Sequence, residues 1–110
     1  MAGLAERFPG LVVPAFGLHP WYLDSRSGTW EESLRARLAC PGAAVGEIGL
    51  DHAVDSPARD VQDAVFRRQM EIAAELGLPV SVHCRRAWGA LVEHLEALSP
   101  RPPAFVIHSY

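Results

Sequence analysis

Short apolar runs alternate along the chain with longer segments in which apolar residues recur every three or four positions. The apolar runs are typical of buried strands and cover residues 11–19, 43–50, 79–83 and 104–108. Helical spacing of apolar residues predicts three helices, within residues 30–38, 57–76 and 91–98. Strands and helices that alternate in this way predict an α/β fold, in which right-handed βαβ crossovers build a parallel sheet.

Capping residues predict where the helices begin and end. Thr29 and Glu32 have the spacing of a capping box at the start of the first helix. Ser56 is predicted to be the N-cap of the second helix, with Pro57 at the first helical position. Gly77 is predicted to be the C-cap of that helix, because glycine readily adopts the left-handed conformation found there.

Length and composition indicate a small globular protein. The chain has 110 residues, of which 49% are hydrophobic and 21% charged. No apolar run approaches the ~20 residues of a membrane helix, and no secretory signal is recognisable, so a cytoplasmic location is expected. The net charge of −3 offers no general attraction for a polyanion, so local charge or metal would have to attract nucleic acid. Cys40 and Cys84 lie outside any CxxC spacing and are expected to be reduced thiols.

Glu47 makes the second predicted strand unusual, because it places a carboxylate in an apolar run. An isolated buried carboxylate costs several kcal/mol or more, so Glu47 should be protonated, ion-paired or bound to a metal. The other strands carry His19, His83 and His108 at or near their carboxyl ends. Each alone is more often an ordinary core histidine, but the ends of parallel strands meet at one face. Together the four side chains offer a ligand set for zinc, manganese and related divalent ions.

Four motifs follow one another along the chain: GLHPWY at 17–22, VGEIGLD at 45–51, VF..Q...A..L.LPV.VHCR at 65–85 and VIHSY at 106–110. In this order and spacing they resemble the TatD family of metal-dependent deoxyribonucleases, within the amidohydrolase-like (β/α)8 barrels. The resemblance implies that Glu47 bridges two divalent ions (Mg, Mn or Zn) and that His83 and His108 each bind one of them. Such ions would activate water to hydrolyse a phosphodiester of DNA, without an organic cofactor.

Two charged residues beside these ligands each have two interpretations. Asp51 could orient a ligand histidine or Arg85 from outside the metal's own ligand set, or it could simply cap its loop. Arg85 lies two residues after His83 and could clamp a phosphate oxygen with its planar guanidinium, which would make it a catalytic residue together with Glu47. The rival interpretation is a salt bridge between Arg85 and Asp51.

Further residues are expected to line the same pocket. His19 matches the GxHP element of the family and is expected beside the metal site without being a ligand. Tyr110 follows the last predicted strand and is also expected near the pocket. Trp21 and Tyr22 are expected to pack within a loop, with stacking on a base or sugar as the alternative.

The resemblance also implies an incomplete barrel. Family members begin with a strand that carries an HxH pair and have a late metal-binding aspartate, and neither is in this sequence. A (β/α)8 barrel takes ~250 residues. Residues 1–110 are therefore expected to form a single incomplete domain, the central half of a TIM-type barrel with four strands and three helices. The remainder of the barrel would be needed for a complete site, and the isolated chain is expected to be inactive.

Two other functions are compatible with the sequence. One is an amidohydrolase-like metal enzyme that acts on a substrate other than nucleic acid, because one fold hosts several chemistries. The other is a non-catalytic half-barrel that binds a partner through its open sheet edges.

Overall fold

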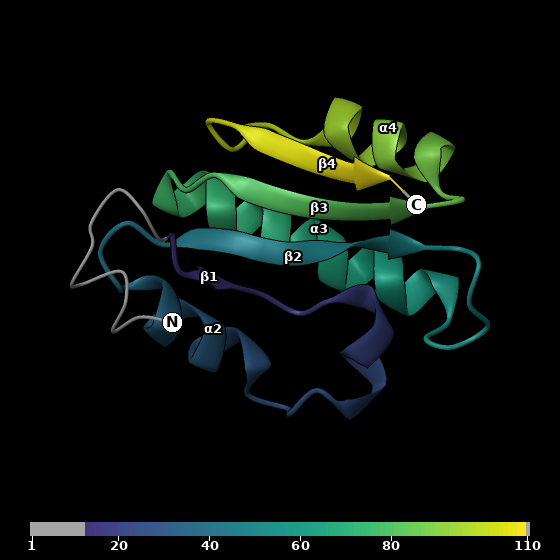
Figure 1. Ribbon diagram of the computed structural model, residues 1–110, viewed down its shortest axis with the longest axis horizontal. Helices are drawn as coiled ribbons and strands as arrows, with labels where there is room; N and C mark the ends of the chain where they lie inside the picture. Colours follow the sequence, from purple (N-terminus) through teal and green to yellow (C-terminus); the bar gives the residue numbers. More distant parts are fainter. Residues whose placement is uncertain (1–12, 110) are drawn as a thin grey trace.

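Four parallel strands form a twisted sheet in the order β1-β2-β3-β4 (Figure 1). The structure is a computed structural model that describes residues 13–109. The elements follow in the order β1 (Ala15–Phe16), η1 (Pro20–Ser25), α2 (Trp30–Leu38), β2 (Ala44–Asp51), α3 (Arg59–Leu76), β3 (Val80–Arg85), α4 (Trp88–Ala97) and β4 (Phe105–Ser109). The predicted α/β class is confirmed, because each strand pairs in parallel with the strand that precedes it and a helix connects each pair.

The hydrophobic core lies between the sheet and α3, which runs behind β2 and β3 in Figure 1. Ile48 and Leu50 of β2 are completely buried, as are Phe66 and Ile72 of α3. Burying a side chain of this size contributes ~1.5–3 kcal/mol. Leu76 was predicted to lie on the same apolar stripe but is exposed, because it is the last residue of α3 and extends past the sheet. This packing leaves the opposite face and the carboxyl ends of the strands to carry polar side chains.

The predicted C-cap of α3 is confirmed, whereas its predicted start is wrong. Gly77 adopts the left-handed conformation with φ of 68°. At the other end, α3 begins two residues later than predicted, with Ala58 as the N-cap. The Ser56 hydroxyl donates to the carboxylate of Asp24 instead of capping the helix. The carbonyl of Pro57 accepts a hydrogen bond from the side chain of Gln62, so Ser56 and Pro57 both have partners outside the helical hydrogen-bond pattern.

The capping box predicted at the start of α2 does not form. Thr29 does occupy the N-cap position, but its side chain makes no capping hydrogen bond. Its hydroxyl instead lies 3.1 Å from that of Ser27, so two neighbouring side chains satisfy each other. The helix itself covers the predicted residues.

The first strand is shorter than predicted, since β1 comprises two residues of the expected range 11–19. Residues 11 and 12 lie outside the described part of the chain. At the other end, the Leu18 N–H donates to the Gln69 side chain at 2.7 Å, and the Gln69 amide donates to the Leu18 carbonyl at 3.3 Å. A buried glutamine of α3 thus takes the place of a strand partner, and the chain turns into the short 3-10 helix η1.

Within residues 13–109, α2, α3 and α4 are all too short or too polar to cross a lipid bilayer.

Candidate metal centre

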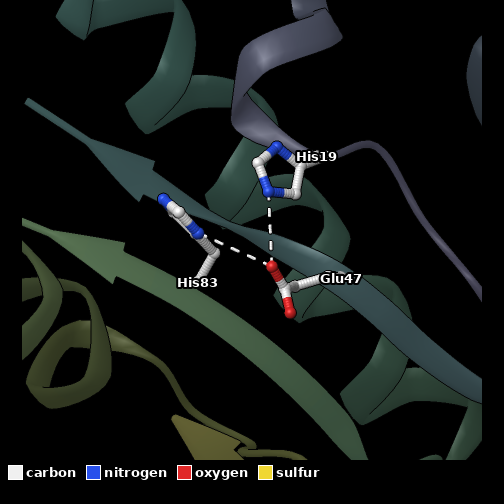
Figure 2. A group of neighbouring side chains, drawn as sticks. All are labelled: His19, Glu47 and His83. Atoms are coloured by element: carbon white, nitrogen blue, oxygen red, sulfur yellow. Dashed lines mark ion pairs between the residues drawn. The ribbon is translucent and has the colours of Figure 1, made fainter. Parts of the chain in front are cut away.

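Three side chains that could bind a metal converge at the sheet: Glu47 from β2, His83 from β3 and His19 from the residue before η1 (Figure 2). Glu47 Oε1 lies 3.3 Å from His19 Nε2 and 3.5 Å from His83 Nδ1. The possible ligand atoms of the three residues all lie within 4.8 Å of one another. Carboxylate oxygens and imidazole nitrogens are ligand types that suit a divalent cation.

Glu47 is the only residue of β2 that is not fully buried. Its side chain is 28% exposed, so the strand does not bury an isolated carboxylate. The carboxylate is thus partly exposed and also lies close to two imidazoles. Of the three states considered for Glu47, the geometry supports pairing with His19 and a position close to a second possible metal ligand, His83 Nδ1.

Asp51 is completely buried and holds His83 in place. Its Oδ2 accepts hydrogen bonds from Trp21 Nε1 at 2.7 Å and from His83 Nε2 at 3.0 Å, and its Oδ1 accepts from the Ala53 N–H at 2.9 Å. Burial by itself raises the pKa of Asp51, but these hydrogen bonds outweigh it and hold the pKa below its usual value. Asp51 is therefore a carboxylate, and it accepts a hydrogen bond from the protonated Nε2 of His83. This leaves His83 Nδ1 as the ring atom that faces Glu47, an arrangement common in histidine ligands.

His19 lies next to His83, with ring centroids 4.7 Å apart, and its Nε2 faces Glu47. Its Nδ1 accepts a hydrogen bond from the Trp21 N–H at 3.2 Å, which caps η1. Burial, together with the nearby His83, lowers the pKa of His19 despite the attraction of Glu47. A neutral ring whose Nδ1 accepts a hydrogen bond carries its proton on Nε2, the atom that faces Glu47. In this arrangement His19 donates to Glu47, as suits a pocket residue next to the ligands.

The other predicted site residues lie around this cluster or beyond it. His108 is paired in register with His83 on the neighbouring strand, but it is exposed and is not one of the three convergent residues. Arg85 Nη1 lies 4.0 Å from Asp51 Oδ2, at the outer limit of a salt bridge, and its side chain extends toward solvent. Tyr110 lies outside the described residues.

Two buried glutamines of α3 position the site; Gln69 occurs in the third sequence motif, but neither Gln62 nor Gln69 was predicted to have a role. Gln62 accepts from the Asp51 N–H at 2.7 Å and donates to the Asp51 carbonyl at 2.9 Å. Gln69 makes the equivalent pair of bonds with Leu18, the residue before His19. The sequence does contain a sign of these two residues, because Gln62 and Gln69 are seven positions apart and so share the predicted apolar helix face that also carries Val65. Polar residues on a buried helix face need partners, which here are the backbone groups beside the site.

The protein has a parallel α/β sheet of the barrel-forming class and a Glu–His cluster that could hold a metal ion. The sequence profile of the TatD related DNase family matches residues 1–110. The chain therefore belongs to the TatD related DNase family.

Curated relatives and a solved structure agree with this assignment. Relatives named 3'-5' ssDNA/RNA exonuclease TatD include those of Yersinia pseudotuberculosis, 33% identical over 108 residues, and of Pantoea sp. strain At-9b, 37% identical over 109 residues. In each case the match covers 97% of this chain and 42% of the relative. The chain thus spans less than half the length of these relatives.

The crystal structure of YjjV, a TatD homologue from Escherichia coli K12, superposes with a TM-score of 0.74 at 34% sequence identity. The match covers 86% of this chain and 38% of YjjV. The four strands therefore correspond to part of a TIM-type barrel, as predicted.

Proposed function

We propose that this protein provides the central part of a divalent-metal-dependent nuclease that hydrolyses phosphodiester bonds of DNA, as an exonuclease. The observation that carries the proposal is one Glu47 oxygen that lies 3.3 Å from His19 Nε2 and 3.5 Å from His83 Nδ1 at the sheet. The names of the relatives, which describe exonucleases of single-stranded DNA and RNA, support a nucleic-acid substrate. A cytoplasmic location is part of the same proposal.

Each residue has a distinct part in the proposed chemistry. Divalent ions, two in an intact site and Mg, Mn or Zn by ligand type, would activate water and stabilise charge on the phosphate. Glu47 and His83 would hold these ions, with Asp51 keeping His83 in the required tautomer. His19 would orient the Glu47 carboxylate through Nε2. Arg85, whose guanidinium reaches toward solvent, would bind a phosphate oxygen.

His108 would serve as the ligand of a second ion in the complete barrel. It is paired in register with His83, so the two side chains belong to the same face of the sheet. We propose that residues 1–110 form one incomplete domain and that the rest of the barrel supplies the remaining ligands. The 110-residue chain by itself would then bind a metal weakly and would not hydrolyse DNA.

Replacing Glu47 with Gln tests the proposal. The substitution removes the negative charge and one ligand oxygen, so Mn²⁺ affinity in isothermal titration should fall on the order of 100-fold. Glu93→Gln is the matched control, because Glu93 is an exposed residue of α4 and should bind the ion as the parent chain does.

Hydrolysis is measured in a complete barrel, built by replacing the matching segment of YjjV with residues 13–109. A fluorescent single-stranded oligonucleotide should be degraded by this chimera with Mn²⁺, and Glu47→Gln should abolish the degradation. Near-normal activity of Glu47→Gln would contradict the metal-binding role. Cleavage of amides or esters, with DNA left intact, would favour the amidohydrolase alternative.

A further inference from the structure

Trp21 stands at the rim of the candidate metal centre with its orientation fixed. Its indole N–H donates to Asp51 Oδ2 at 2.7 Å, the same oxygen that accepts from His83 Nε2 at 3.0 Å. The Trp21 ring centroid lies 4.7 Å from that of His19 and 5.5 Å from that of His83, with interplanar angles of 64° and 74°. The indole ring therefore packs edge-on against both imidazoles. It is hydrogen-bonded to the same buried Asp51 oxygen as His83, a proposed metal ligand.

The exposure of Trp21 does not fit the loop-packing role expected from the sequence. Its side chain is 47% exposed although its polar edge is hydrogen-bonded to a buried carboxylate. The neighbouring Tyr22 is 63% exposed. By contrast, Trp30 on α2 packs against the hydrophobic core, as a structural tryptophan does. An indole held rigidly by its edge and open on its surface can accept a planar ligand without losing side-chain freedom on binding.

We propose that Trp21 is a stacking face for a nucleobase of single-stranded nucleic acid, placed so that a phosphate of the same strand reaches the Glu47–His83 cluster. The inference rests on the proposed nuclease function and adds a base-binding subsite to it. Bases stack on aromatic side chains with little dependence on sequence, because every base has a π face. Trp21 would therefore contribute affinity and position the strand without selecting a particular base.

Trp88 provides a matched control. It is the first residue of α4 and is 46% exposed, which equals the exposure of Trp21 within a percentage point. Among the contacts between described residues, no hydrogen bond or ring contact joins Trp88 to the cluster. Loss of a surface tryptophan as such should therefore affect both positions alike, whereas loss of a stacking face should affect Trp21 alone.

The test is binding of a phosphorothioate single-stranded oligonucleotide with 2-aminopurine at its 3' end to the complete-barrel chimera that carries residues 13–109, in Mn²⁺. Stacking quenches 2-aminopurine fluorescence, so the readout does not require hydrolysis. Trp21→Leu should weaken binding about 10-fold and abolish the quenching, given the usual strength of stacking between a base and an aromatic side chain. Trp21→Phe keeps an aromatic face but loses the N–H, and it should retain binding within about 3-fold. Trp88→Leu should bind as the parent does.

Different results would overturn different parts of the proposal. If Trp21→Leu binds and quenches like Trp88→Leu, the stacking face is wrong while the proposed nuclease function stands. If Trp21→Phe is as weak as Trp21→Leu, the effect comes from the hydrogen bond to Asp51, and stacking is again wrong. If the parent chimera binds Mn²⁺ but neither binds nor quenches the oligonucleotide, the proposed nucleic-acid substrate fails and the subsite fails with it.

Discussion

His83 of β3 and His108 of β4 share a register on neighbouring strands, yet their surroundings differ. His83 is 1% exposed and donates to the buried carboxylate of Asp51. His108 is exposed, and none of the hydrogen bonds between described residues involves its side chain. Strand register brings both imidazoles to the same level of the sheet, but only one is held there. Strand register therefore sets where a histidine lies, whereas hydrogen bonds to neighbouring side chains decide whether it is held there.

The difference comes from the strands on either side. β3 lies between β2 and β4, and β2 supplies Asp51 beside His83. Within the described residues, β4 is the edge of the sheet, where Val106 is also exposed. Three experiments test whether His83 is held more firmly than His108. They separate the strands beside His83, remove each histidine in turn, and protonate Asp51.

The largest effect is expected from Gly49→Ala. Gly49 lies opposite His83 in the register of β2 and β3, and a Cβ at this position would lie 1.8 Å from the His83 carbonyl oxygen. The strands must separate to admit it, so we expect the free energy of unfolding to fall by ~4 kcal/mol or more in urea denaturation. Gly89→Ala is the control, because a Cβ at Gly89 of α4 meets no atom within 4 Å. That variant should be as stable as the parent or more stable by up to ~1 kcal/mol.

An intermediate effect is expected from His83→Ala compared with His108→Ala. Without His83, the buried Asp51 carboxylate loses a hydrogen bond and a cavity remains, so we expect a loss of ~2–3 kcal/mol in metal-free buffer. His108→Ala removes an exposed side chain and should change stability by less than ~0.5 kcal/mol. If the two variants lose the same free energy of unfolding in urea denaturation, His83 is held no more firmly by its neighbours than His108.

The smallest effect is a difference in acid sensitivity between the parent chain and Asp51→Asn. The hydrogen bonds to Asp51 hold its pKa in the folded protein below the unfolded value of ~3.9. The stabilisation from the carboxylate is therefore complete above about pH 4 and is lost as the pH falls through the folded pKa. The stability of the parent should decline more steeply below about pH 4 than that of Asp51→Asn, as measured by thermal unfolding across that range. Parallel declines would indicate that Asp51 titrates normally.

Several features of the fold follow from local sequence. The alternation of apolar runs and helical spacing predicted the parallel sheet, and Gly77 ends α3 because a left-handed residue is needed there. The capping residues were less predictable. Ser56 and Thr29 are good capping residues by type, but their hydroxyls pair with Asp24 and Ser27. Intrinsic capping preference is worth about 1 kcal/mol, which one competing hydrogen bond can offset.

The sequence by itself determined the ligand types and their placement on successive strands, because periodicity and motif spacing are properties of the chain. It also singled out Glu47 as a carboxylate that required a partner. Only the tertiary structure brought His19 to 3.3 Å from Glu47, gave His83 its Asp51 partner and tied Trp21 to the same carboxylate. These contacts join residues 28 to 32 positions apart through hydrogen bonds whose partners are chosen by folding. Such choices depend on which groups are buried together, and no local pattern contains that information.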